Sequence, residues 1–379
     1  PIVDHPIHDE TMVPFTGPAI AGSKELDCPL LILEPLRAGY RWASERHHRF
    51  VMDGMIDNRA ACEGKAVTYY PYLENAPGEG AGLLEALAKD AACVVSDDYP
   101  AFFIPRMHDT VAKRLGVRFE LVDSNGILPL RATDRVFPTA YSFRGYLQKN
   151  VKPFVGEAPK ENPLARLRLP KLSGPPRTVT QKWPVADLDG IRLGTLQIDH
   201  SVAAVDGTTG GSAAAGEILR SFLGAILPRY GEDRNEPERR GTSQLSPHLH
   251  FGHISVHEVF AGVAKGEKDW SVDILPDKGR GSREGWWKMS GPAEGFLDEL
   301  ITWRELGYNM ASKIGQEYEE YASLPEWAQA TLDVHRDDPR DYVYSLDEFE
   351  NAQTHDTLWN AAQNQLVRDG RIHNYLRML

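Results

Sequence analysis

Short β-rich apolar runs alternate with helical patterns through the first third of the chain, and this alternation restricts the fold more than any other feature. The apolar runs cover residues 29–33, 66–72, 92–96 and 119–122, and the helical patterns between them cover residues 42–63, 82–89 and 104–115. Strands that alternate with helices pair in parallel, with the helices packed on the faces of the sheet. The sequence therefore predicts an α/β doubly wound parallel sheet.

Helical periodicity dominates from about residue 208 onward. Apolar residues recur at a spacing of three to four over residues 213–227, and similar patterns cover residues 257–264, 293–314, 325–333, 346–353 and 357–368. Between the two parts the chain is richer in proline and mixed charge. We expect an α/β N-terminal domain at residues 1–132, an interdomain connection at residues 133–200 and an all-α domain at residues 201–379. No strand is placed in residues 1–23, which are rich in proline and glycine.

The net charge of −12 over 379 residues argues against a protein that coats DNA through charge alone. It permits recognition of one damaged site, for which a local basic rim suffices. No apolar run approaches the ~20 residues that span a bilayer, and residues 1–5 lack the pattern of a signal peptide. Three scattered cysteines suit a reducing cytoplasm, so we expect a cytoplasmic protein without membrane contact, and no protein partner is evident.

A hydroxyl-rich segment, Thr242-Ser243-Gln244-Leu245-Ser246, precedes Pro247. Hydroxyls and free backbone N–H groups at a helix start can bind an anion, since the helix dipole favours negative charge there. The alternative is an ordinary helix cap without a ligand. Histidines at positions 248, 250, 253 and 257 raise the question of zinc, but no cysteine or carboxylate cluster accompanies them, and we expect no metal.

Two further segments carry residues suited to a base pair and a cofactor. Glu299 and Trp303 are four residues apart, which stacks them on one helix face, where an indole can pack on an extruded base and a carboxyl can bond its edge. The alternative is an ordinary helix with a core tryptophan and a surface salt bridge from Glu305. Asn374, Arg377 and Met378 follow at i, i+3 and i+4 on a predicted final helix, or form only its cationic last turn.

Taken in order, these segments, together with the phrase around Trp359, resemble the helical domain of DNA photolyases, most closely the class II cyclobutane pyrimidine dimer photolyases. The resemblance implies a carbon–carbon lyase that repairs dimers in UV-damaged DNA by light-driven electron transfer from reduced, anionic FAD. The dimer is flipped out of the duplex in that family. An antenna chromophore of unspecified identity is common there too.

The resemblance also assigns roles to individual residues. It implies that FAD is bound by Tyr230, Thr242, Ser243, Leu245, Ser246 and Arg377. It implies that Glu299 orients the dimer and that Trp303 and Met378 pack on it. Asn374 acts in the same reaction by approaching the flavin ring. Trp359 resembles one member of a tryptophan relay that reduces the flavin, although core packing explains a tryptophan there equally well.

Two alternatives to repair stay open at this point. A cryptochrome-like light sensor would keep the flavin site and lose affinity for the dimer, whereas a truncated, non-catalytic relative would lose the cofactor. Family members continue beyond the segment that matches residues 370–378. We therefore expect a C-terminally incomplete helical domain that holds flavin weakly or not at all.

Overall fold

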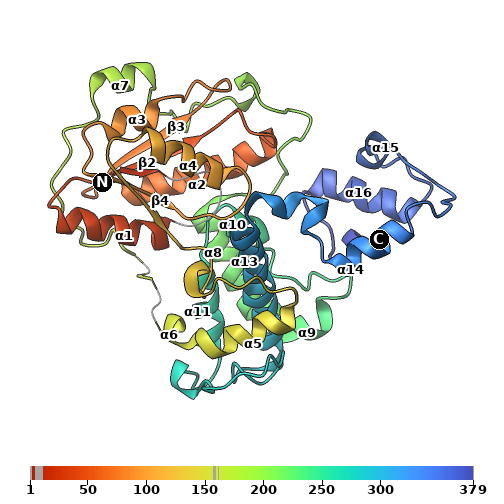
Figure 1. Ribbon diagram of the computed structural model, residues 1–379. Helices are drawn as coiled ribbons and strands as arrows, with labels where there is room; N and C mark the ends of the chain where they lie inside the picture. Colours follow the sequence, from red (N-terminus) through yellow and green to blue (C-terminus); the bar gives the residue numbers. More distant parts are fainter. Residues whose placement is uncertain (1, 5–11, 157–158, 161, 379) are drawn as a thin grey trace.

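The computed structural model describes residues 2–4, 12–156, 159–160 and 162–378, so Pro1 and Leu379, which bound the expected domains, lie outside it. Its sheet contains β1 (Ile2–Asp4), β2 (Leu31–Leu36), β3 (Thr68–Leu73), β4 (Cys93–Asp97) and β5 (Arg118–Val122). All the strands are parallel, in the order β3-β2-β1-β4-β5 (Figure 1). This order matches the first five strands of the doubly wound dinucleotide-binding sheet, whose full order is 3-2-1-4-5-6. The alternating pattern predicted a doubly wound parallel sheet.

Helices cover both faces of the sheet. The N-terminal part contains α1 (Met12–Glu25), α2 (Glu45–Cys62), α3 (Leu83–Ala88) and α4 (Ile104–Arg114). Leu31 and Leu33 pack in a cluster with α3, while Ile32 packs in a cluster with α1. Successive side chains of a strand point to opposite faces, so β2 is buried on both sides and reads as a continuous apolar run.

Strand β1 occupies the centre of the sheet, and sequence analysis placed no strand there. Ile2 pairs with Leu31 on one side and with Val94 on the other. Three residues within a segment rich in proline and glycine give no periodic pattern. The identity of β1 as a strand therefore comes from its two neighbours, which supply hydrogen-bond partners along both edges.

The helical part is built around one apolar core. Its helices are α5 (Ala140–Asn150), α6 (Lys152–Val155), α8 (Gly211–Ser221), α9 (Tyr230–Asp233), α10 (Ser246–His250), α11 (Val256–Gly266), α12 (Gly291–Leu297) and α13 (Arg304–Ile314). Two of the long predicted helices contain a turn of π-helix, namely η3 (Phe222–Ile226) after α8 and η6 (Asp298–Trp303) between α12 and α13. Turns of this kind are rare and occur frequently at functional sites.

The predicted connection between the two parts contributes to both cores. Helix α5 packs into the helical core through Phe143 and Leu147. Further along, α7 (Arg177–Lys182) returns to the sheet, where Val179 and Trp183 pack beside Tyr70. The Tyr70 hydroxyl donates to the Trp183 carbonyl at 2.5 Å. The segment therefore ties the two parts together instead of serving as a loose linker.

The two parts also meet directly, where α2 packs against α8 and the segment around α10. The ring of Phe50 lies 5.0 Å from that of His248 and 4.8 Å from that of His253. A Cβ atom at Gly210 would overlap the carbonyl oxygen of Phe50, and one at Gly54 would overlap the His253 ring. Glycine at both positions thus allows the close approach of the two parts.

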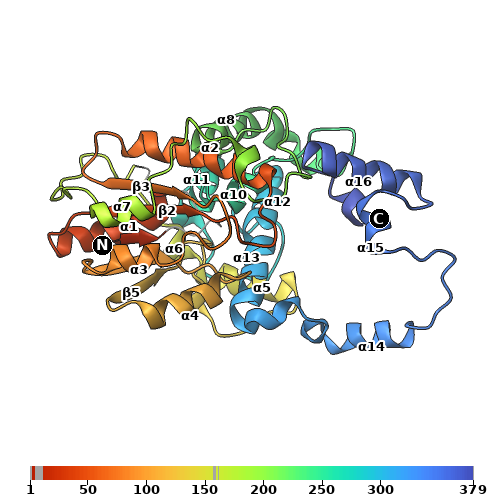
Figure 2. The ribbon, with the colours of Figure 1, turned by 90° about the horizontal axis from the view of Figure 1, so that it is seen from above.

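The C-terminal helices α14 (Glu326–Val334), α15 (Leu346–Glu350) and α16 (Thr357–Asp369) lie to one side of the body (Figure 2). Short 3-10 turns complete the chain: η1 (Leu130–Ala132), η2 (Leu193–Thr195), η4 (Leu227–Arg229), η5 (Val272–Ile274), η7 (Gly315–Glu319), η8 (Tyr321–Ser323) and η9 (Tyr375–Met378). Among the helices of the described residues, none combines the length and apolar character needed to cross a membrane.

Arg46 of α2 fastens α16 to the body. Its guanidinium donates to the carbonyl oxygens of Leu366 at 3.4 Å and Val367 at 2.5 Å, in the last turn of α16. It also donates to the Ala203 carbonyl at 2.9 Å. A cation that bonds the final carbonyls of a helix satisfies unpaired acceptors and interacts favourably with the helix dipole.

Replacing Arg46 with alanine is expected to loosen α16 and to lower the free energy of unfolding by about 1 kcal/mol. The measurement is amide hydrogen exchange, which should accelerate over residues 357–369 and stay unchanged in the sheet. The control is Arg368→Ala, because that exposed arginine pairs with its neighbour Asp369. Equal exchange in α16 of both variants would show that Arg46 does not hold the helix.

Candidate functional site

Arg234 joins two of the residues that sequence analysis assigned to separate segments. Its Nη1 donates to Oε1 of Glu299 at 2.8 Å, and its guanidinium carbon lies 5.5 Å from the centre of the Tyr230 ring. Arg283 places a second cation 3.9 Å from the same carboxylate. Sequence reasoning missed Arg234, although its position one helical turn after Tyr230 was a usable signal.

Burial and charge shift the protonation equilibria of this group. Burial raises the pKa of the Tyr230 hydroxyl, and the neighbouring Arg234 only partly opposes that shift. Burial lowers the pKa of Arg234, but the hydrogen bond to Glu299 and the interaction with the Tyr230 hydroxyl group more than offset this effect, so the pKa is raised. Tyr230 is therefore a neutral hydroxyl and Arg234 a fixed cation at physiological pH.

Glu299 and Trp303 both lie on the π-helical turn η6, at its second and last residues. The Trp303 side chain is 51% exposed, whereas Glu305 is 4% exposed. The alternative of a core tryptophan beside a surface Glu305 is therefore wrong on both counts. The turn itself is fixed by the buried Asp298, whose carboxylate accepts from Nε and Nη2 of Arg144 at 2.7 and 3.0 Å.

The segment from Thr242 to Ser246 forms a compact turn before α10. Thr242 Oγ1 accepts from the Gln244 amide at 2.5 Å, and Ser243 Oγ accepts from the backbone N–H of Leu245 at 3.3 Å. Leu245 is buried and precedes the helix without a side-chain cap, so the alternative of a hydroxyl-capped helix is not what the structure contains. Ser246 is exposed at the first position of this five-residue helix.

The final segment differs from the predicted helix. Residues Tyr375–Met378 form a 3-10 turn instead of an α-helix that starts at Asn374. Arg377 donates to Asn374 Oδ1 at 2.7 Å, since residues three apart are aligned in a 3-10 turn. Met378 is 65% exposed, and because it lies four residues after Asn374 it is not aligned with Asn374 in a 3-10 turn. The i, i+4 relation between Asn374 and Met378 is therefore lost.

Two contacts join the final segment to the segments that contain Arg234 and Gln244. The His373 ring nitrogen Nε2 lies 3.1 Å from the Arg234 carbonyl, and Arg371 donates to the Gln244 side chain at 2.6 Å. Because Arg234 holds Glu299 and Gln244 holds Thr242, these contacts link all three segments. Trp359 stands apart from them on α16, where its ring lies 5.1 Å from that of Phe349.

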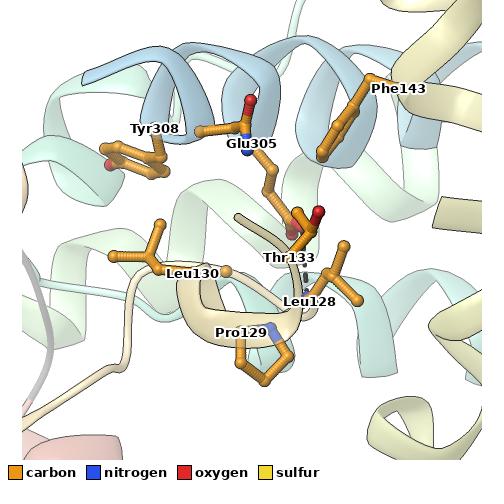
Figure 3. A pocket seen from close by; sticks show the side chains of 9 residues that line it. Leu128, Pro129, Leu130, Thr133, Phe143, Glu305 and Tyr308 are labelled. Atoms are coloured by element: carbon orange, nitrogen blue, oxygen red, sulfur yellow. Dashed lines mark hydrogen bonds between the residues drawn. The ribbon is translucent and has the colours of Figure 1, made fainter. Parts of the chain in front are cut away.

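A small cavity lies between α13 and the segment at residues 126–133 (Figure 3). Its lining consists of Gly126, Leu128, Pro129, Leu130, Thr133, Phe143, Glu305, Tyr308 and Asn309, and includes none of the residues assigned to the flavin or the dimer. Glu305 accepts from the backbone N–H groups of Ile127 at 2.7 Å and Leu128 at 3.2 Å, and burial raises its pKa to about 7. It fastens residues 127–128, at the end of the α/β part, to α13.

Buried histidines gather where the α/β part meets α10. Burial lowers the pKa of His48, His248 and His250 to about 4 in each case. His253 Nδ1 accepts from the backbone N–H of Gly211 at 2.9 Å, which gives this ring a structural partner. Within the ranges that the structure describes, no group of three or more histidine, cysteine or carboxylate side chains is placed to hold a metal ion.

These histidines predict that the protein is unstable to acid. Their pKa values are lower in the folded state than in the unfolded chain, so the unfolded chain binds more protons below about pH 6.5. Stability should therefore fall as the pH drops from about 6.5 toward 4, at a limit of about 1.4 kcal/mol per pKa unit and histidine. Glu305 opposes this trend, because its raised pKa favours the folded state below pH 7.

Denaturant unfolding at pH 7, 6 and 5 measures this dependence. The free energy of unfolding should decrease toward pH 5, and His248→Phe should flatten the decrease because it removes one titrating ring and keeps an aromatic contact with Phe50. A free energy that rises toward pH 5 in the unmodified protein would contradict the prediction.

The chain is similar over most of its length to proteins named deoxyribodipyrimidine photo-lyase. The relative from Methanothermobacter thermautotrophicus is 30% identical over 368 residues, which cover 95% of this chain and 72% of the relative. The chain belongs to the DNA photolyase family. Further photolyases from Potorous tridactylus and Oryza sativa are 30% and 29% identical and are covered to 60% and 62% of their length.

The chain thus spans less than two thirds of two of these curated photolyases. A solved class III photolyase from Agrobacterium tumefaciens has the same fold, with a TM-score of 0.67 and 18% identity over all of this chain and 71% of that structure. No family model matches the chain. The family predicted from the sequence is therefore confirmed, while the class II subgroup and the individual site residues stay predictions.

Proposed function

We propose that the chain forms the flavin- and lesion-binding part of a photolyase that uses light to repair cyclobutane pyrimidine dimers in DNA. The observation that supports this most is the placement of the Glu299 carboxylate, held by Arg234, on the same turn as the exposed indole of Trp303. A carboxylate beside an aromatic face suits a base step that has been rotated out of the duplex. The names of the relatives agree with this activity.

In this proposal three residues contact the dimer and one positions a contact residue. Trp303 packs its exposed ring on the dimer, and Glu299 bonds the pyrimidine edge while Arg234 keeps its carboxylate in place. Met378, which is also exposed, adds an apolar contact. Arg234 and Arg283 supply part of the local basic rim that a negatively charged protein needs to bind a phosphate backbone.

The proposed cofactor is FAD in its reduced anionic form, which supplies the electron for dimer cleavage when it absorbs light. The residue chemistry fits a flavin dinucleotide, because Thr242, Ser243 and Ser246 supply hydroxyl donors for the diphosphate, beside the Tyr230 ring and Leu245, and Arg377 supplies a guanidinium for the flavin ring. Ser246 and Arg377 are both exposed, and Asn374 holds the guanidinium of Arg377. A cation near a flavin ring favours its anionic form.

If this proposal holds, purified protein should retain FAD through gel filtration, with flavin absorbance in the protein peak, which is the opposite of the weak or absent flavin binding expected from the sequence. Ser246→Val and Arg377→Ala should each weaken FAD binding by roughly tenfold, the order expected when a charged hydrogen bond is lost. Arg368→Ala is the control, since this arginine lies on the surface of α16. If no flavin coelutes, or if the three variants bind FAD equally, these residues do not form the flavin site.

A comparison of binding to dimer-containing and undamaged DNA, added to the FAD measurement, separates the two rivals. A protein that holds FAD but binds dimer-containing DNA no better than undamaged DNA would be a light sensor. One that binds neither would be a non-catalytic relative. Trp303 and Glu299 favour repair over sensing, because a sensor needs no aromatic and carboxylate pair at the mouth of the site.

Three further assignments belong to the proposal. The cysteines Cys28, Cys62 and Cys93 are free thiols, which suits a reducing cytoplasm. The α/β part, at residues 1–132, is the proposed place of an antenna chromophore, with the connection at residues 133–200 and the flavin domain at residues 201–379. Trp359 is the proposed entry point for electrons that reduce the flavin.

A further inference from the structure

Strand β5 forms one outer edge of the parallel sheet, where it pairs with β4 alone. The backbone N–H of Asp98 donates to the Val122 carbonyl at 2.7 Å, so the backbone groups of Val122 point toward β4. Successive residues of a strand direct their N–H and C=O groups to opposite sides in the plane of the sheet. The groups of Phe119 and Leu121 therefore point away from the sheet, and no bond to another described segment uses them.

This edge is also the more exposed part of the sheet. None of the five residues of β5 is buried, whereas all five residues of β4 are. Helix α4 lies beside β5 at the margin of the α/β part (Figure 2), and its His108 ring is 5.8 Å from the Phe119 ring. A strand with one unpaired side is a template for a further strand.

The residues around Phe119 are matched in a way that suits pairing with an identical strand. Val117 and Leu121 lie two residues to either side, and Arg118 and Glu120 lie one residue to either side. If two copies of this strand pair in antiparallel direction about Phe119, each Arg118 lies opposite the Glu120 of the other copy. Each Val117 lies opposite Leu121. Opposite charges that face each other across a strand pair stabilise it, and like charges destabilise it.

Charges on an edge strand commonly prevent pairing, but the two charges on β5 have opposite signs. They pair with each other within the strand, where Arg118 Nε lies 2.5 Å from Glu120 Oε1. The two side chains are 77% and 43% exposed. Each can therefore exchange its partner in the same strand for the equivalent partner in a second copy, and no charge is left unpaired.

We propose that the protein forms a twofold-symmetric dimer through antiparallel pairing of β5 with β5 of a second copy. Phe119 faces Phe119 at the axis, and the two five-stranded sheets become one continuous sheet. The outward groups of Val117, Phe119 and Leu121 supply about six backbone hydrogen bonds, because each facing pair exchanges both of its bonds. The arrangement is closed, so association stops at the dimer.

The strength of this dimer follows from its size. One pair of short strands buries less surface than the roughly 1,200 Å² of a standard interface, so association is weak and depends on concentration. The α4 helices, which lie beside β5, also approach each other across the axis and add to the contact. None of the residues assigned to the flavin or to the lesion lies on β5, so the dimer does not rest on the proposed function.

Sedimentation velocity of the full chain over a range of concentrations measures this association, and dimers should appear as the concentration rises. Arg118→Glu and Glu120→Arg each place like charges opposite each other and should weaken association by at least about tenfold. The control is Arg336→Glu, which reverses a similarly exposed arginine of another salt bridge, with Asp333, in the C-terminal segment. It should dimerise like the unmodified protein.

A mixture of the two variants tests the antiparallel register. The two acidic side chains of Arg118→Glu face the two basic side chains of Glu120→Arg, so an equimolar mixture should associate about as tightly as the unmodified protein. The double variant Arg118→Glu/Glu120→Arg should do so alone. An unmodified protein that stays monomeric, single variants that dimerise like the control, or a mixture that stays monomeric would each overturn the proposal, whether or not the protein repairs DNA.

Discussion

Replacing Trp303 with alanine is expected to weaken binding of dimer-containing DNA about 30-fold, or roughly 2 kcal/mol, the usual value of one aromatic ring stacked on a base. The free energy of unfolding should change little, because half of the side chain is already exposed to solvent and the ring is not part of the core cluster. Fluorescence anisotropy with a short thymine-dimer duplex measures the affinity, and denaturant unfolding measures the stability.

Trp327→Ala is the matched control for this variant. Trp327 lies on α14 and is 73% exposed, so its replacement removes an exposed indole of the same kind away from Glu299. Its affinity for dimer-containing DNA should equal that of the unmodified protein. If the two variants weaken binding by the same factor, Trp303 has no specific contact with the lesion.

Replacing Glu305 with alanine is expected to lower the free energy of unfolding by about 3 kcal/mol. The Glu305 carboxylate accepts from the backbone N–H groups of Ile127 and Leu128, and each buried donor that loses its acceptor costs about 1–3 kcal/mol. The carboxylate also lies against Gly126, where an added Cβ atom would come within 2.7 Å of it. Residues 126–128 and α13 should therefore loosen together.

Glu305→Gln separates the lost hydrogen bonds from the lost volume. Glutamine keeps the shape and one acceptor oxygen, so it should recover about half of the stability lost in the alanine variant. It should also remove the opposing pH trend that the raised pKa of Glu305 imposes between about pH 4.5 and 7. If the alanine and glutamine variants both lost little stability and to the same extent, the carboxylate would not be the group that holds residues 127–128.

The sheet and most helices could be predicted because their signals are local. The predicted runs at 29–33, 66–72, 92–96 and 119–122 each overlap a strand, and each predicted helix of the second half up to residue 368 overlaps a helix. The three-residue strand β1 could not be predicted, since its hydrogen-bond partners come from β2 and β4, which lie far along the chain.

The details of the site depend on tertiary contacts that periodicity does not encode. The apolar spacing over residues 293–314 is the same for a helix with or without a π turn, so η6 was not predicted. Glu305 gave no signal of burial, because its partners are two backbone N–H groups more than 170 residues away in sequence. The final α-helix was wrong because residues 374–378 form only a 3-10 turn.

What the sequence did predict is which segments belong together. Tyr230, Glu299 and the segment from Thr242 to Ser246 were grouped only by their resemblance to photolyases. The structure links their segments through Arg234, Gln244, Arg371 and His373, none of which had been assigned a role. The residues that join the motif segments thus require the structure, while the contacts of the motif residues with a ligand stay predictions.

Illumination of the FAD-loaded protein with thymine-dimer DNA tests the central claim most directly. With the flavin reduced, we expect recovery of thymine monomers in the light and none in a dark control, with much less recovery in Glu299→Ala than in Trp327→Ala. Unchanged dimer content after illumination of a protein that holds reduced FAD and binds the damaged duplex would contradict the account.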